Sequence, residues 1–226
     1  MVESPINSTK SKNLIMKLFF SIPTKVLLFC GFLSSLFYIS TDLIASWWYK
    51  GYNILDQNYS ELLATGAPTR PFMILMSFIY TFLIVAFAVG IWISANPKRF
   101  AHFTGMAIIT YAVIGLSGGL IFQMDLRGAE KTLLGSLHPL MTSIMSIFIM
   151  LSIALGAFLH NKKFRYYSFI TIVVLLIFGG LTALQAPQLE AGGLTPWMGL
   201  TERINIYTTM LWFALLSFIL ILREKK

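Results

Sequence analysis

Six long runs of apolar residues constrain this chain more than any other feature of its sequence. Each run has about the 20 apolar residues that a helix needs to cross the hydrocarbon core of a bilayer. Lipid offers the backbone no hydrogen-bond partner, and the runs do not alternate, so we expect helices rather than strands. The expected spans are Lys25–Ser46, Phe72–Ser94, Ala101–Phe122, Pro139–His160, Tyr167–Ala186 and Ile204–Leu222.

The composition agrees with this interpretation. Charged residues make up only 12% of the chain and hydrophobic residues 57%, whereas a soluble domain carries about 25% charged residues. The sequence therefore predicts an all-α, polytopic membrane helical bundle with about six transmembrane helices. We expect a polar tail over residues 1–24, the transmembrane domain over residues 25–222 and a short basic tail over residues 223–226.

The basic residues fall mainly on one side of the expected bundle. Of the 17 Lys and Arg, twelve lie in the two tails or in the second-to-third and fourth-to-fifth connections. The positive-inside rule places this side in the cytoplasm, so we expect both termini inside and the protein in the inner (cytoplasmic) membrane. Such clusters between apolar runs set topology, and the net charge of +8 therefore does not indicate binding to nucleic acid.

The acidic residues fall on the opposite side. Seven of the nine Asp and Glu lie at the outer helix ends or in the three outer connections, residues 47–71, 123–138 and 187–203. Acidic residues contribute little to orientation, so the positive-inside rule does not explain their placement. The outer connections are also longer than the two basic turns, and long ordered loops tend to carry function. The outer face is therefore the expected location of a functional site.

Two residues illustrate what this face could do. Asp42 is expected about one turn inside the outer end of the first span, and an ionisable residue at membrane depth is a functional candidate by default. Arg70 is expected at the start of the second span, where its fork of donors could bind a lipid phosphate or another anion. Both residues have a structural alternative, because Asp42 could pair with an outer arginine and Arg70 with Asp42 or Glu61.

A third candidate, His138, precedes a proline. Pro139 suits the first turn of the fourth helix, which would place His138 at the mouth of that helix as a neutral imidazole. A zinc site needs three or four ligands, and the other two histidines are expected at the cytoplasmic face, so we expect no metal. No nucleotide-binding or cofactor motif is present, and Thr201 is expected to cap the last helix. The complete set of candidates is Asp42, Glu61, Arg70, Asp125, Arg127, His138, Glu202 and Arg203.

Four stretches of the sequence stand out by their order and spacing. They are Asp42, residues 60–71 from Ser-Glu to Arg-Pro, Met124-Asp125-Leu126-Arg127-Gly128 leading to His138, and residues 199–205 before Trp212. Together they resemble a known family of prokaryotic membrane proteins, the domain of unknown function 998, over nearly the whole chain. The resemblance implies a multi-helix membrane protein and supplies no activity, and the polar amino-terminal tail departs from the family pattern.

Three functions remain open at this point. The protein could bind or help transport a lipid-like or small polar ligand in an outward recess, with Arg70, Arg127 and Arg203 holding its anionic groups. It could instead be a lipid hydrolase or transferase that uses His138 and outer carboxylates for proton transfer. The outer charges could also form a purely structural network of ion pairs. That last interpretation predicts a carboxylate partner for each arginine and no remaining cavity. In each case membrane lipids are the expected partners.

Overall fold

The computed structural model describes residues 23–224, and these residues fold into helices joined by loops, with no strand among them. This confirms the all-α prediction. All six long helices are long and apolar enough to cross a membrane. They are α2 (Thr24–Trp48), α3 (Arg70–Ser94), α4 (Lys98–Leu120), α5 (Leu133–Gly156), α6 (Lys162–Ala183) and α8 (Met198–Arg223). The short helices are η1 (Tyr59–Leu62), η2 (Ala157–Leu159) and α7 (Ala186–Glu190).

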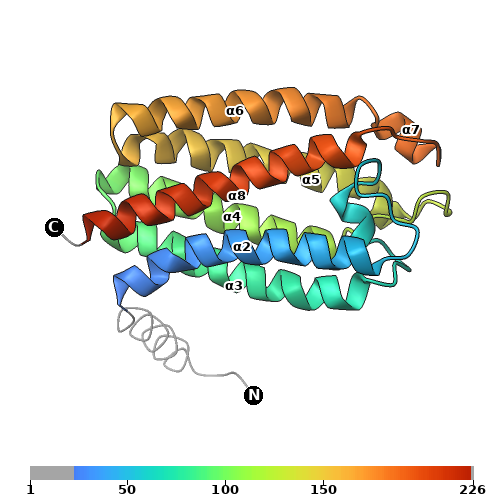
Figure 1. The fold of residues 1–226 in the computed structure, drawn as a ribbon, viewed down its shortest axis with the longest axis horizontal. Coiled ribbons are helices and arrows are strands. Elements are labelled where there is room, and N and C mark those ends of the chain that lie inside the picture. Colours follow the sequence, from blue (N-terminus) through green and yellow to red (C-terminus); the bar gives the residue numbers. More distant parts are fainter. Residues whose placement is uncertain (1–22, 225–226) are drawn as a thin grey trace, which may run out of the picture.

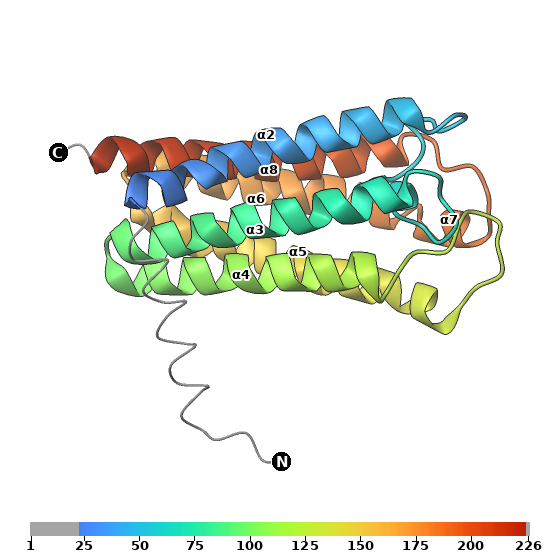
Figure 2. The same ribbon diagram turned by 90° about the horizontal axis from the view of Figure 1, so that it is seen from below.

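The long helices form a closed ring in which each helix packs against its neighbours in the chain, and α8 returns to pack against α2 (Figures 1 and 2). Figure 1 shows that the bundle has two different ends. The terminal end holds the start of α2, the end of α8 and the tight α3–α4 and α5–α6 turns. The loop end holds the longer α2–α3, α4–α5 and α6–α8 connections. This grouping matches the two faces expected from the charge pattern.

An aromatic cluster fills the middle of the ring. Trp212 and Phe213 of α8 and Phe87 of α3 are fully buried. The Phe213 ring lies edge-on to both Trp212 and Phe87. The Trp212 indole Nε1 donates a hydrogen bond of 2.9 Å to the Ser168 hydroxyl on α6. This bond satisfies the one polar group of a buried indole, so α3, α6 and α8 are held together without an unpaired donor.

The structure corrects the expected start of two helices. α5 begins at Leu133, six residues before Pro139, because the Thr132 hydroxyl caps it by accepting from the Gly135 amide. Pro139 therefore lies inside α5, and His138 is not at the helix mouth. α8 begins at Met198, so Thr201 does not cap it. Both helices begin earlier than hydropathy predicts because their first two turns contain polar residues. Hydropathy does not take into account the protein groups that bind those residues. The expected tails fall almost entirely outside the described residues.

Candidate functional site

A buried ion pair joins the first and last long helices at the loop end. Asp42 of α2 is fully buried and Arg203 of α8 is 4% exposed. The guanidinium donates two parallel hydrogen bonds to the carboxylate, from Nε to Oδ2 at 3.0 Å and from Nη2 to Oδ1 at 2.9 Å. The Tyr207 hydroxyl donates to Oδ2 at 2.7 Å and the Ser46 hydroxyl to Oδ1 at 3.2 Å. Both carboxylate oxygens are thus satisfied from within the protein.

The rest of the Arg203 guanidinium binds the α2–α3 loop. Its Nη1 donates to the carbonyl oxygens of Ile54 at 2.9 Å and Gln57 at 3.0 Å, and Nη2 donates to the Tyr52 hydroxyl at 2.8 Å. Burial raises the pKa of the Tyr52 phenol, which keeps it neutral. The phenol can then donate onward to the Asn58 carbonyl at 2.7 Å. Arg203 therefore has no donor left for a ligand.

This arrangement requires a glycine on α8. A Cβ atom at Gly199 would lie 2.3 Å from the Gln57 carbonyl oxygen, 2.5 Å from the Ile54 carbonyl oxygen and 3.0 Å from Arg203 Nη1. The loop backbone approaches the helix this closely so that its carbonyl groups can reach the guanidinium. Gly199 thus belongs to the Arg203 cluster although it carries no side chain.

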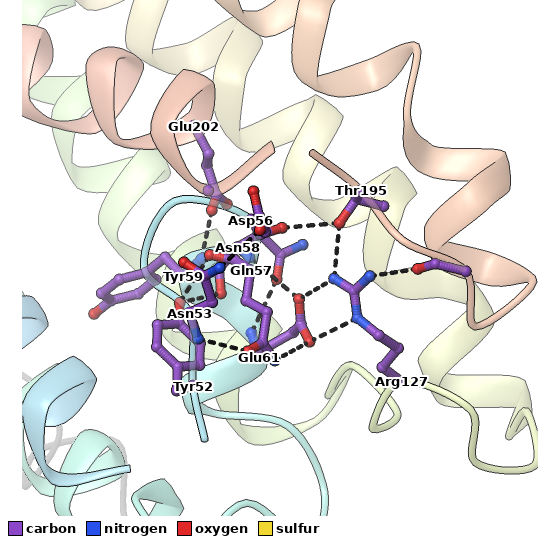
Figure 3. Close-up of polar contacts among 12 residues, drawn as sticks. Tyr52, Asn53, Asp56, Gln57, Asn58, Tyr59, Glu61, Arg127, Thr195 and Glu202 are labelled. Carbon is purple, nitrogen blue, oxygen red and sulfur yellow. Dashed lines mark hydrogen bonds and ion pairs between the residues drawn. The ribbon is translucent and has the colours of Figure 1, made fainter. Parts of the chain in front are cut away.

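A second ion pair ties the loops to one another (Figure 3). Glu61 of η1 is 1% exposed, and Arg127 of the α4–α5 loop contacts it through Nη2 at 2.8 Å and Nε at 3.2 Å. Asn58 holds the carboxylate in place through a capping box. The Asn58 side chain accepts from the Glu61 amide at 3.1 Å, while Glu61 accepts from the Asn58 amide at 3.2 Å.

The remaining donors of Arg127 reach the loop that leads into α8. Nη1 donates to the Gly193 carbonyl at 2.6 Å and Nη2 to the Thr195 hydroxyl at 2.9 Å. Thr195 in turn donates to the Asp56 carbonyl at 2.8 Å, and the Asp56 carboxylate accepts from the Trp197 amide at 3.0 Å. Figure 3 shows these groups pointing toward one another from three connections. All three loops are therefore locked into one cap.

Two further candidate carboxylates stabilise local structure. Glu202 of α8 accepts a short hydrogen bond from the Tyr59 amide and so fastens η1 to α8. Asp125 accepts from the Thr132 amide at 2.8 Å and the Thr132 hydroxyl at 3.0 Å, which positions the residue that caps α5. Neither carboxylate forms a salt bridge among the residues that the structure describes. Both therefore order the backbone of the cap without pairing with an arginine.

His138 is not placed for acid–base chemistry with a carboxylate. Its Nδ1 lies 2.7 Å from the Phe122 carbonyl oxygen, so Nδ1 carries the proton that makes this bond. Within residues 23–224, the only hydrogen bond of the imidazole is this one to the backbone. The contact joins α5 to the start of the α4–α5 loop, directly after α4.

Arg70 differs from the other two candidate arginines. It is the first residue of α3, and it forms no salt bridge among the described residues. Its Nε is buried without any hydrogen-bond partner in this part of the chain. A buried donor without a partner costs free energy, which makes Arg70 the one candidate cation whose hydrogen-bonding capacity is still available.

A small cavity lies between α2, α3 and η1. It has a volume of about 20 Å³, enough for about one water molecule and too small for a lipid-like ligand. The described residues contain no group of three or more His, Cys, Asp or Glu that could hold a metal ion. The polar groups of the cap thus bind mainly one another. The cavity is lined by Phe37, Tyr38, Thr41, Tyr59, Met76, Ser77 and Tyr80.

Several partners in these clusters were not expected from the sequence. Ser46 lies one helical turn after Asp42, and Tyr207 one turn after Arg203, so helical spacing could have suggested both. The Asn58-x-x-Glu61 spacing of the capping box was also readable. Nothing in the sequence indicated the carbonyl groups of Ile54, Gln57 and Gly193, because backbone acceptors carry no residue signature.

The comparisons with known proteins agree with the fold and leave the chemistry open. The family model described as protein of unknown function (DUF998) matches residues 32–219. The chain belongs to this family. No curated protein and no solved structure matches the chain. The match begins within α2 and ends within α8, so both ion-paired clusters fall inside the family region.

Proposed function

We propose that this multi-pass membrane protein binds the anionic headgroup of a lipid-like molecule at its loop end, through Arg70. The observation that carries the proposal is that Arg70 is only half-buried and has no salt bridge, and that its Nε has no partner among the described residues. A guanidinium presents a planar fork of donors that matches a phosphate or carboxylate. An external anion at the accessible side of the guanidinium would therefore supply a partner that this part of the protein does not.

The surroundings of Arg70 support a headgroup rather than a deeper ligand. A cation at the start of a helix is disfavoured by the helix dipole, so an anionic partner offsets a local cost. Phe72 of α3 packs edge-on against Trp48 at the end of α2, and the neighbouring Trp47 is 89% exposed. Tryptophans collect at the level of the lipid headgroups. Arg70 would then lie at the depth of the phosphates.

The structure bears differently on the two alternatives, a structural network of ion pairs and a hydrolase or transferase. Arg203 is fully occupied by protein groups and Arg127 makes four hydrogen bonds within the cap, which supports a structural role for both rather than ligand binding. The hydrolase or transferase alternative lacks support, because the described hydrogen bond of His138 goes to a backbone carbonyl. The proposal therefore narrows the candidate ligand contacts from eight residues to Arg70 and treats the ion-paired clusters as its scaffold.

We also propose that the loop end faces outward from the inner (cytoplasmic) membrane. Support comes from the distribution of cations: the described part of the terminal end has seven Lys and Arg against five at the loop end. Five of those at the terminal end lie in the first four residues of α4 or α6, directly after the two short turns, where the positive-inside rule applies most strongly. Labelling of a cysteine introduced at Lys50 by an impermeant reagent on whole cells tests the orientation, and labelling only after lysis would contradict it.

Retention of lipid by the purified protein tests the function. Native mass spectrometry of the protein released from nanodiscs of phosphatidylglycerol and phosphatidylcholine gives the ratio of the two lipids retained. Arg70→Gln is expected to lower this ratio about fivefold, the effect of about 1 kcal/mol per cation, without lowering the melting temperature. Arg70→Lys keeps the charge but loses the fork, so an intermediate ratio is expected.

Lys50→Gln is the matched control, because Lys50 is an exposed cation at the same end. Its retained lipid ratio is expected to equal that of the unmodified protein. Equal ratios for Arg70→Gln and Lys50→Gln would refute the proposal. So would a lower melting temperature for Arg70→Gln with lipid retention unchanged, because Arg70 would then act within the fold.

A further inference from the structure

The terminal end of the bundle carries cations without carboxylate partners. Every salt bridge among the described residues lies at the loop end. Glu224 is the one acidic residue described at the terminal end, and it is exposed. Charge there is consequently one-sided, whatever the orientation of the protein in the membrane. The cations described at this end are Lys25, Lys98, Arg99, Lys162, Lys163, Arg165 and Arg223.

Two of these cations converge on the α5–α6 turn. The Arg165 guanidinium of α6 lies over the Phe158 ring, with Cζ 4.5 Å from the ring centroid. The Arg223 guanidinium at the end of α8 donates from Nη1 to the Leu159 carbonyl at 2.5 Å. Phe158 is itself stacked on Phe100 of α4 at 4.7 Å between centroids. Guanidinium groups from two helices thus contact consecutive residues of one rigid turn.

The two guanidinium groups on this turn have donors to spare. Arg165 is half-buried and its Nε has no hydrogen-bond partner among the described residues, and Arg223 is exposed and uses only Nη1 in the contact described. Burial lowers the pKa of His160 in the same turn, and the charge of Arg223 lowers it further. Two cations on one turn favour an anion beside them.

We propose that Arg165 and Arg223 form a phosphate-binding site at the α5–α6 turn, occupied by an acidic phospholipid of the adjacent leaflet or by free phosphate. Basic pockets between transmembrane helices bind acidic lipid headgroups in this way. Tyr166, next to Arg165, is 69% exposed, which suits an aromatic side chain at the membrane interface. Lys162 and Lys163 are exposed beside the site and add to its charge. The proposal does not depend on Arg70.

Thermal unfolding of the purified protein in a neutral detergent tests this site. Phosphatidylglycerol is titrated into the unmodified protein, into Arg165→Gln/Arg223→Gln and into the control Lys25→Gln/Arg99→Gln. The control loses the same charge at the same end but leaves the turn intact, because Lys25 and Arg99 are exposed. Arg70 is present in all three proteins, so any lipid bound there contributes equally to each titration.

We expect the concentration of phosphatidylglycerol that gives half the stabilisation to rise about 25-fold in the turn variant, because each of the two cations contributes about fivefold. The control is expected to change much less. A parallel titration with inorganic phosphate identifies the source: stabilisation at millimolar concentration assigns free phosphate, and stabilisation by lipid alone assigns a headgroup. Equal titrations of the turn variant and the control with both ligands would overturn the proposal.

Discussion

The two ends of this bundle differ in how their cations are buried and paired. At the loop end, Arg203 is buried and Arg127 is half-buried, and each is bound by a carboxylate and by carbonyl or hydroxyl groups. At the terminal end, the described cations are mostly exposed, and none of them forms a salt bridge. Paired charge at the loop end therefore stabilises the fold, whereas the unpaired cations, which are Arg70 and those of the terminal end, remain available to bind anions.

The difference follows from desolvation. A buried charge without a partner costs several kcal/mol, so a guanidinium inside a membrane protein has to be paired with a carboxylate and saturated with acceptors. An exposed cation keeps its water and needs no partner, and its pairs contribute about 0–1 kcal/mol. Replacing an arginine with glutamine should therefore change the free energy of unfolding much more at a buried, paired site of the loop end than at the terminal end.

The largest expected effect is that of Arg203→Gln. The change leaves the fully buried Asp42 carboxylate with only two hydroxyl donors and frees the carbonyl groups of the α2–α3 loop. Removing one partner of a buried pair costs about 3–5 kcal/mol. Reversible unfolding by sodium dodecyl sulfate in mixed micelles measures this loss of stability.

Arg99→Gln is the control for this comparison, because Arg99 is exposed at the terminal end. Its effect on the free energy of unfolding is expected within about 0.5 kcal/mol, as for other surface substitutions. Similar losses of unfolding free energy for Arg99→Gln and Arg203→Gln would contradict the proposed difference between the two ends.

A smaller loss is expected from Gly199→Ala. The new methyl group would lie 2.3 Å from the Gln57 carbonyl oxygen, so the loop has to move away from Arg203. Overpacking of this kind costs about 1–3 kcal/mol. Gly180→Ala on α6 is the matched control, because a Cβ atom there meets nothing within 4 Å. The same unfolding measurement should show Gly180→Ala neutral or slightly stabilising, and a loss as large as that of Gly199→Ala would count against the close approach.

The smallest effect is expected from Lys131→Gln. Lys131 and Glu190 form a salt bridge of 3.0 Å at the loop end, but both side chains are 53% exposed. An exposed pair contributes about 0–1 kcal/mol, and salt screens it. Thermal unfolding at low and high salt should show a shift of a few degrees at most that disappears at high salt. A loss of stability comparable to that of Arg203→Gln would mean that burial does not determine how much each ion pair stabilises the fold.

The sequence was sufficient to predict the six spans and their grouping into two ends, because both rest on hydropathy and on the placement of Lys and Arg. It was insufficient for the starts of α5 and α8. The first two turns of those helices contain polar residues such as Ser136 and Glu202. These residues are tolerated because the Leu133 carbonyl and the Tyr59 amide form hydrogen bonds with them. Those partners come from the tertiary structure or the local backbone, which an apolar window does not register.

The sequence predicted at which end of the bundle the eight candidate residues lie, but not how they pair. All eight residues lie at the loop end, as expected, yet the sequence could not assign Arg203 to Asp42 and Arg127 to Glu61. Those pairs join residues 161 and 66 positions apart. Only the packing of the ring brings them together, and it leaves Arg70 without a carboxylate partner within residues 23–224.

The most direct test of the account is a double-mutant cycle on Glu61 and Arg127, which asks whether the cap is held by its ion pair. Free energies of unfolding are measured for the unmodified protein, Glu61→Gln, Arg127→Gln and the double variant. Buried, hydrogen-bonded partners are expected to couple by about 1–3 kcal/mol, so the double variant should lose clearly less stability than the sum of the single losses. Strictly additive losses would contradict the claim that paired charge locks the loop end.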